Sequence, residues 1–171
     1  MSFGKAVVCS VAVLAFLPVF GWASGTNQTL FIIERSKNAN VVHYDARLTP
    51  EGALDPKEPV AAYWVMLAED GRHEGLNVVE RHKAYGFDIR FDASKKLWVM
   101  TLAAYRKREI IVRQIEGGAR AEMVIADRPS AFEKMYIHST EGLLLPKVNY
   151  IEFFGKDLET GEKRYEKFVP D

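Results

Sequence analysis

Short stretches of alternating apolar and polar residues, joined by short polar connectors, most restrict how this chain can fold. From Leu30 onward such stretches recur along nearly the whole sequence, with the period of two that is typical of β-strands. Only 76–85 shows helical spacing. Parallel strands need long, usually helical, crossovers, so a parallel sheet built from βαβ units is excluded.

Ten stretches are predicted to be strands. They cover residues 30–33, 41–48, 60–67, 87–91, 97–105, 109–115, 121–126, 132–139, 149–154 and 163–169. The first two form an expected hairpin around 36–40, and 60–67, which is apolar on both faces, is expected to be a central strand. The charged triplet 106–108 is interpreted as a hairpin turn rather than a phosphate-binding tip.

The short connectors favour a mainly β fold in which an antiparallel meander forms a closed or nearly closed β-barrel, with a two-layer β-sandwich as the alternative. One short helix is expected at 76–85, with Gly86 as its C-terminal cap. Its stripe of Val78, Val79, His82 and Tyr85 is interpreted as a face that docks on the sheet.

Residues 1–23 have the layout of a secretory signal peptide. Met1–Lys5 carries one positive charge, and the following run to residue 20 is uncharged and mostly apolar. Gly21-Trp22-Ala23 supplies the small residues of a cleavage site. The run is shorter than the about 20 apolar residues of a membrane span, so we expect cleavage and no transmembrane span afterwards. The lone Cys9 lies inside this run.

The remainder, 24–171, is expected to be a single antiparallel β domain without a cysteine, and therefore without a disulfide or a thiolate metal site. The whole chain has 23 basic and 23 acidic residues. No long block of like charge is present, so nucleic acid is not an expected partner. Export without an anchor predicts a periplasmic location, with full secretion as the alternative.

Few residues carry a recognisable catalytic pattern. No phosphate-binding loop, dinucleotide-binding turn or nucleophile elbow is present, and the four histidines lack metal-binding spacing, so no catalytic, metal or cofactor site is predicted. Ser36, His43 and Asp45 lie close in sequence. A serine hydrolase would need the serine within reach of the imidazole, and a solvated hairpin face explains the three residues better.

Aromatic residues are concentrated in the predicted strands, Tyr44, Trp64 and Tyr105 among them. Inward-facing aromatics can line a ligand cavity inside a barrel. They can equally fill a solid core. Both alternatives stay open from the sequence.

The stretch 31–45, which reads FIIERSKNANVVHYD, resembles the exported bacterial family known as domain of unknown function 4833. Further points of resemblance are Pro59, the run from Tyr63 to Leu67, Glu80 and Ala84-Tyr85-Gly86. The Glu-Arg-Ser-Lys-Asn-x-Asn segment is the most distinctive part. The resemblance covers most of the chain after the signal peptide and implies no activity, cofactor or catalytic residue.

The same segment is the best candidate for a ligand site. Glu34 and Ser36 are expected to share the inward face of Leu30 and Ile32, which would need a cation such as Arg47, Arg81 or Lys83 to pair with the buried carboxylate. A structural ion pair is the alternative. The candidate ligand-binding residues are Glu34, Arg35, Ser36, Lys37, Asn38, Asn40, Tyr44, Arg47 and Trp64.

Three functions are therefore consistent with the sequence. The first is a non-catalytic β-barrel that binds a small amphipathic, lipid-like or acidic molecule. The second is a structural or protein-interaction module of the cell envelope, which would show an exposed apolar patch or an unpaired sheet edge. The third is a serine hydrolase, whose motif is incomplete.

Overall fold

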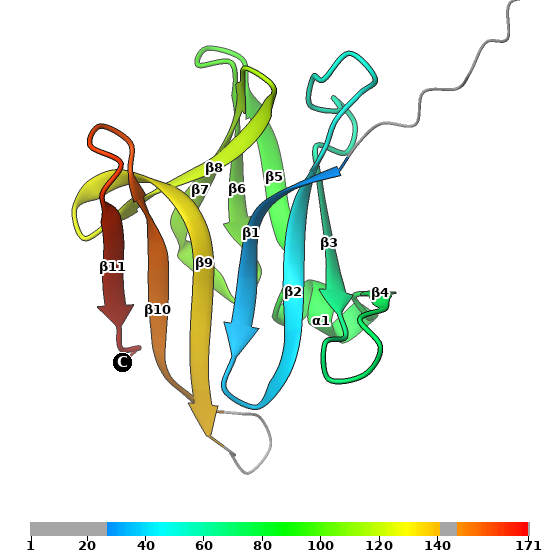
Figure 1. The fold of residues 1–171 in the computed structure, drawn as a ribbon, viewed down its shortest axis with the longest axis vertical. Helices are drawn as coiled ribbons and strands as arrows, with labels where there is room; N and C mark the ends of the chain where they lie inside the picture. Colours follow the sequence, from blue (N-terminus) through cyan, green and yellow to red (C-terminus); the bar gives the residue numbers. More distant parts are fainter. Residues whose placement is uncertain (1–26, 141–146, 171) are drawn as a thin grey trace, which may run out of the picture.

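The computed structural model describes residues 27–140 and 147–170. These residues form a mainly β structure with one short helix (Figure 1). The predicted signal peptide at 1–23 lies outside them.

Eleven strands and the helix follow one another in the described part of the chain. They are β1 (Asn27–Arg35), β2 (Asn38–Arg47), β3 (Val60–Val65), β4 (His73–Gly75), α1 (Val78–Lys83), β5 (Phe87–Asp92), β6 (Leu97–Leu102), β7 (Tyr105–Ile115), β8 (Gly118–Ile125), β9 (Arg128–Thr140), β10 (Lys147–Asp157) and β11 (Lys163–Phe168).

The ten predicted strands all match strands of the structure. The eleventh, β4, has three exposed residues and no apolar pattern, which is why the sequence did not predict it. The turn expected at 106–108 was wrong, because those residues belong to β7 and the turn lies at 103–104.

The strands do not form a simple antiparallel meander. The sheet runs in the order β4-β3-β2-β1-β9-β8-β7-β6-β5, and β10 pairs with β9 and β11. The pair β1–β9 is parallel, with Ile32 opposite Lys134 and Arg35 opposite Ile137. The first part of β9 pairs with β8, the later part pairs with β1, and β10 pairs along nearly all of it. This long strand therefore joins two antiparallel wings, β1–β4 and β5–β8.

Of the expected closed or nearly closed barrel, the closed form is not found: the sheet curls strongly into a half-barrel but remains open (Figure 1). Strands β4 and β5 end the main path and do not pair with each other among the described residues. The sheet stays open because β8 and β1 pair with successive parts of the same edge of β9 and then diverge from each other. The two wings curve toward each other and enclose the core between them.

The core is apolar and draws on both wings. Phe31 stacks on Tyr44 with ring centroids 4.3 Å apart and packs on Phe132 at 4.7 Å, while Phe132 packs on Phe153 at 6.4 Å. Each ring buries a large apolar area, and paired aromatic rings add about 0.5–1.5 kcal/mol to that burial. Val42, Tyr44 and Ala46 of β2 are fully buried in this core, and Leu48 just after β2 is buried as well.

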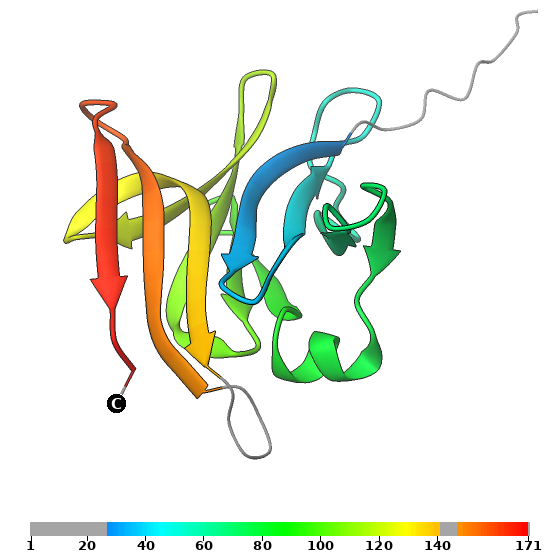
Figure 2. The ribbon, with the colours of Figure 1, turned by 60° about the horizontal axis from the view of Figure 1, so that its bottom comes forward.

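Helix α1 lies between β4 and β5 at one end of the curled sheet (Figure 1, Figure 2). Asn77 caps it: Asn77 Oδ1 accepts a hydrogen bond from the Glu80 amide at 2.9 Å, and Glu80 Oε2 accepts one from the Asn77 amide at 3.0 Å. Of the expected docking stripe only Tyr85, just after α1, packs against the core; Val78, Val79 and His82 do not, since no residue of α1 itself is buried. No helix of the described residues has the length and apolar character needed to cross a membrane.

Candidate functional site

Arg35 is the residue of the distinctive segment that faces the interior. The pairing of β1 with β2 shifts register between Thr29 and Phe31 and again between Ile33 and Arg35. A bulge changes which residues point to each face of a strand. Phe31, Ile33 and Arg35 therefore face inward. Leu30, at the register shift, is buried in the core as expected, but the expected inward face of Ile32, Glu34 and Ser36 was wrong.

The Arg35 guanidinium is held against two aromatic rings. Its Cζ lies 4.4 Å from the centroid of the Trp64 ring, and Nη1 donates to the Tyr85 hydroxyl at 3.3 Å. Nε donates to Asn38 Oδ1 at 3.3 Å. No carboxylate forms an ion pair with Arg35 among the described residues. A half-buried cation is thus placed on an aromatic surface without an anion of its own.

Tyr85 is the residue that completes this arrangement. Its ring meets Trp64 edge-on with centroids 5.0 Å apart, and its carbonyl accepts a hydrogen bond from the Tyr44 hydroxyl at 2.6 Å. Burial raises the pKa of Tyr44 well above its usual value, so this phenol stays a neutral donor. Tyr85 was expected on the helical stripe and not at a site. Its position as an aromatic residue directly before Gly86 was the one signal that could have pointed to it.

A cavity of about 360 Å³ lies beside Arg35. Its wall combines neighbouring positions of β1, β9 and β10 with the end of α1 and the β6–β7 turn. The buried part of the wall is apolar and consists of Ile33, Leu102, Met135 and Ile151. Residues nearer the solvent are Lys37, Val79, Lys83, Ala104 and Val148, with Arg35, Tyr85 and Tyr105 half-buried between the two groups.

Five of the nine predicted ligand-binding residues are brought together by the structure. Arg35, Asn38, Tyr44 and Trp64 gather around Tyr85, and Lys37 lines the cavity.

The other four predicted residues have separate partners. Glu34 is paired with Lys134 at 3.1 Å, in place of the expected Arg47, Arg81 or Lys83. Asn40 is buried and accepts from the Ala68 amide at 3.0 Å, and Arg47 pairs with Glu58. Ser36 Oγ donates to the Ser139 carbonyl and accepts from the Ser139 amide, both at 3.1 Å.

The residues of the hydrolase hypothesis are not brought together. Ser36 Oγ is bonded to Ser139, while His43 lies opposite Ile32 in the middle of the β1–β2 pair. His43 Nδ1 is 3.9 Å from Asp45 Oδ1. A serine nucleophile needs a base within hydrogen-bond reach, and this geometry does not supply one.

Asp45 instead belongs to a polar cluster on the outer face of β2 and β3. Only 4% of it is exposed, and Oδ2 accepts a hydrogen bond from the Tyr63 hydroxyl at 2.5 Å. Burial, together with this hydrogen bond, raises the pKa of Tyr63 to about 12. Burial also lowers the pKa of His43. No cluster of three or more metal-binding side chains occurs in 27–140 and 147–170.

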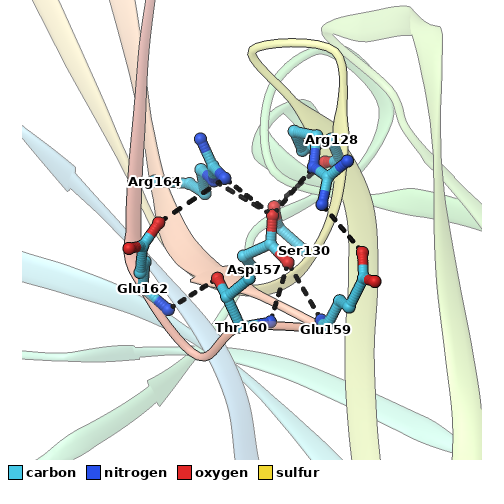
Figure 3. Close-up of polar contacts among 7 residues, drawn as sticks. All are labelled: Arg128, Ser130, Asp157, Glu159, Thr160, Glu162 and Arg164. Atoms are coloured by element: carbon cyan, nitrogen blue, oxygen red, sulfur yellow. Dashed lines mark hydrogen bonds and ion pairs between the residues drawn. The ribbon is translucent and has the colours of Figure 1, made fainter.

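A second buried carboxylate holds the ends of three strands together (Figure 3). Asp157 Oδ2 accepts from Arg128 Nε at 3.0 Å and Arg164 Nη2 at 2.9 Å, and Oδ1 accepts from the amides of Glu159 and Thr160 at 2.9 and 3.1 Å. The amide hydrogen bonds and the guanidinium of Arg128 hold the pKa of Asp157 far below its usual value. Both carboxylate oxygens of Asp157 already have hydrogen-bond partners within the chain, so we interpret this cluster as structural.

A wider groove of about 820 Å³ runs along β7 and β8 toward β11. Two cations, Lys107 and Arg108, line it, and Arg108 already pairs with Glu166, with Nη1 3.0 Å from Oε2. That pairing lowers the pKa of Glu166. Arg108 is therefore neutralised by a carboxylate of its own chain, whereas no described carboxylate pairs with Arg35.

Comparison with known proteins gives one result. The family model described as domain of unknown function (DUF4833) matches residues 31–167. No curated protein and no solved structure matches at a significant level. The match covers the described strands almost completely, including the segment around Arg35, and it confirms the resemblance noted from the sequence. The chain therefore belongs to the family of domain of unknown function 4833.

Proposed function

We propose that this protein is a non-catalytic binding module whose cavity takes a small amphipathic acid. The apolar tail occupies the buried part of the cavity, and the anionic group binds Arg35. Lys37 and Lys83 add positive charge where the cavity meets the solvent.

The observation that carries this proposal is the state of Arg35. A guanidinium stays charged, and removing it from water is costly unless an anion or other acceptor compensates. Trp64, Tyr85 and Asn38 orient the group through contacts that leave its positive charge in place. A carboxylate from a ligand would supply the missing charge in bidentate geometry.

The cavity has the right size and polarity for such a molecule. Ligand pockets typically have volumes of about 300–1,000 Å³ and mostly apolar walls with a few polar groups. Since one water takes about 30 Å³ in the liquid, about 360 Å³ leaves room for roughly ten non-hydrogen atoms. Octanoate is a probe of this size with one tail and one carboxylate.

Isothermal titration calorimetry of octanoate with the wild type and Arg35→Gln tests the proposal. Losing a charge-assisted hydrogen bond costs about 1.5–3 kcal/mol, so Arg35→Gln should weaken binding by about 10- to 100-fold. The matched control is Arg47→Gln, which removes an exposed guanidinium paired with Glu58, away from the cavity. Its affinity should stay within about twofold of the wild type.

Octylamine separates a charge-selective site from a merely apolar one, because it carries a similar tail and the opposite charge. It should bind at least about tenfold more weakly than octanoate, since its ammonium would lie beside a guanidinium. Equal binding of the two probes, or unchanged octanoate binding by Arg35→Gln, would show that Arg35 does not recognise an anion. Absence of octanoate binding by the wild type would refute the proposal as a whole.

A further inference from the structure

Apolar side chains surround the solvent end of the cavity. Val79 and Val148 line the cavity and are 69% and 38% exposed. Val78, next to Val79 on α1, is 74% exposed. Single exposed valines are ordinary, but a group around the entrance of a cavity is a candidate contact surface. We call Lys37, Val78, Val79, Lys83 and Val148 the mouth face.

Most of the charged side chains that the structure describes on and around the mouth face are positive. Lys37 and Lys83 line the entrance, and Arg81 lies exposed in the last turn of α1. The one acid of α1, Glu80, accepts the Asn77 amide hydrogen bond in the helix cap. Exposed valines between lysines suit a surface that is negative outside and apolar beneath, which is the chemistry of an anionic bilayer.

We propose that the mouth face docks on an anionic lipid surface, so that the amphipathic acid passes between the bilayer and the cavity. This inference rests on the proposed function and adds the source of the ligand. The valines enter the interface while the lysines contact lipid phosphates, and the cavity opens toward the acyl chains.

Vesicle flotation tests this docking. The probes are vesicles of phosphatidylcholine alone and vesicles in which about a third of the lipid is phosphatidylglycerol. A basic residue near an anionic surface contributes roughly fivefold in affinity, so the wild type should bind the anionic vesicles at least about tenfold more tightly. The difference should shrink in high salt, because salt screens surface charge.

Val78→Asp is the diagnostic variant. The side chain of Val78 is exposed, and an acid in the first turn of a helix is favourable, so α1 should remain folded. The new charge should repel the anionic lipid and lower vesicle binding at least about fivefold. The matched control is Val124→Asp, at a valine of β8 that is 55% exposed and lies at the opposite end of β9 from Val148. This control should bind vesicles like the wild type.

Octanoate titration of the same proteins separates the two proposals. Octanoate binding together with anionic-vesicle binding that Val78→Asp weakens and Val124→Asp retains supports docking. Octanoate binding without preference for anionic vesicles overturns the docking and leaves the proposed function standing. Loss of vesicle binding in both valine variants would show that net charge causes the effect, and it would overturn the proposal that the mouth face docks on lipid. If the wild type binds neither probe, both proposals fail.

Discussion

At the scale of single residues, Arg35 illustrates how a cation can be kept ready for a ligand. The planar guanidinium stacks on Trp64 and donates separately to Tyr85 and Asn38, so its orientation is set before any ligand arrives. A lysine could not make the same contacts, because its ammonium group has no planar face that stacks on Trp64 while it donates to both partners. Pre-orientation reduces the conformational entropy that the Arg35 side chain loses on binding. A short ligand with few contacts can therefore still be held.

Asp157 is the residue whose titration should matter most for acid stability. Its pKa is held far below the unfolded value, so its stabilising effect is present above about pH 4 and is lost as the pH falls below that value. We predict that the urea midpoint of the wild type falls between about pH 6 and pH 3, and that Asp157→Asn is less stable at the higher pH and loses less on acidification.

Urea denaturation followed by circular dichroism at both pH values measures this effect. Asp88→Asn is the control, because Asp88 is an exposed partner of Arg106 and surface ion pairs contribute little. Its pH dependence should match that of the wild type. The same acid-induced loss in Asp157→Asn and the wild type would show that other carboxylates govern acid stability.

At the scale of elements, the junction from α1 to β5 positions Tyr85 beside the cavity. The backbone folds back so closely that a Cβ at Gly86 would lie 1.7 Å from the Arg81 carbonyl oxygen. The Gly86 amide also donates to the Glu80 carbonyl at 3.2 Å. Because the Arg81 atoms that would clash with this Cβ belong to the backbone, only a shift of the junction can relieve the contact.

We therefore predict that Gly86→Ala lowers the free energy of unfolding by about 2–4 kcal/mol and weakens octanoate binding by displacing Tyr85. Gly75→Ala in β4 is the matched control, since a Cβ there meets nothing within 4 Å. Urea denaturation and calorimetric titration of both variants measure the two effects. A Gly86→Ala protein as stable as Gly75→Ala would contradict the described geometry of this junction.

At the scale of the whole molecule, local patterns predicted the strands but not their arrangement. Alternation revealed the ten longer strands, because side chains in a strand alternate strictly. The parallel β1–β9 pair joins residues about a hundred positions apart, such as Glu34 and Lys134. No local pattern encodes such a contact, so the open, two-winged sheet could not be predicted from neighbouring residues.

The candidate site was predictable in part for the same reason. The polar segment after β1 pointed to Arg35, and the aromatic strand residues pointed to Tyr44 and Trp64. The register shift between Thr29 and Phe31 reversed the expected faces of Glu34 and Arg35, and such an irregularity has no clear signal in this sequence. The walls contributed by β9 and β10 depend on the long-range pairing and were therefore missed.

A crystal structure of the protein with octanoate that carries a terminal bromine would show directly whether the cavity binds the acid. We expect an anomalous bromine peak among Leu102, Met135 and Ile151, with the carboxylate within hydrogen-bond distance of the Arg35 guanidinium. Bromine found only in the groove along β7 and β8, or a cavity left empty at saturating octanoate, would contradict the claim that this cavity is the binding site.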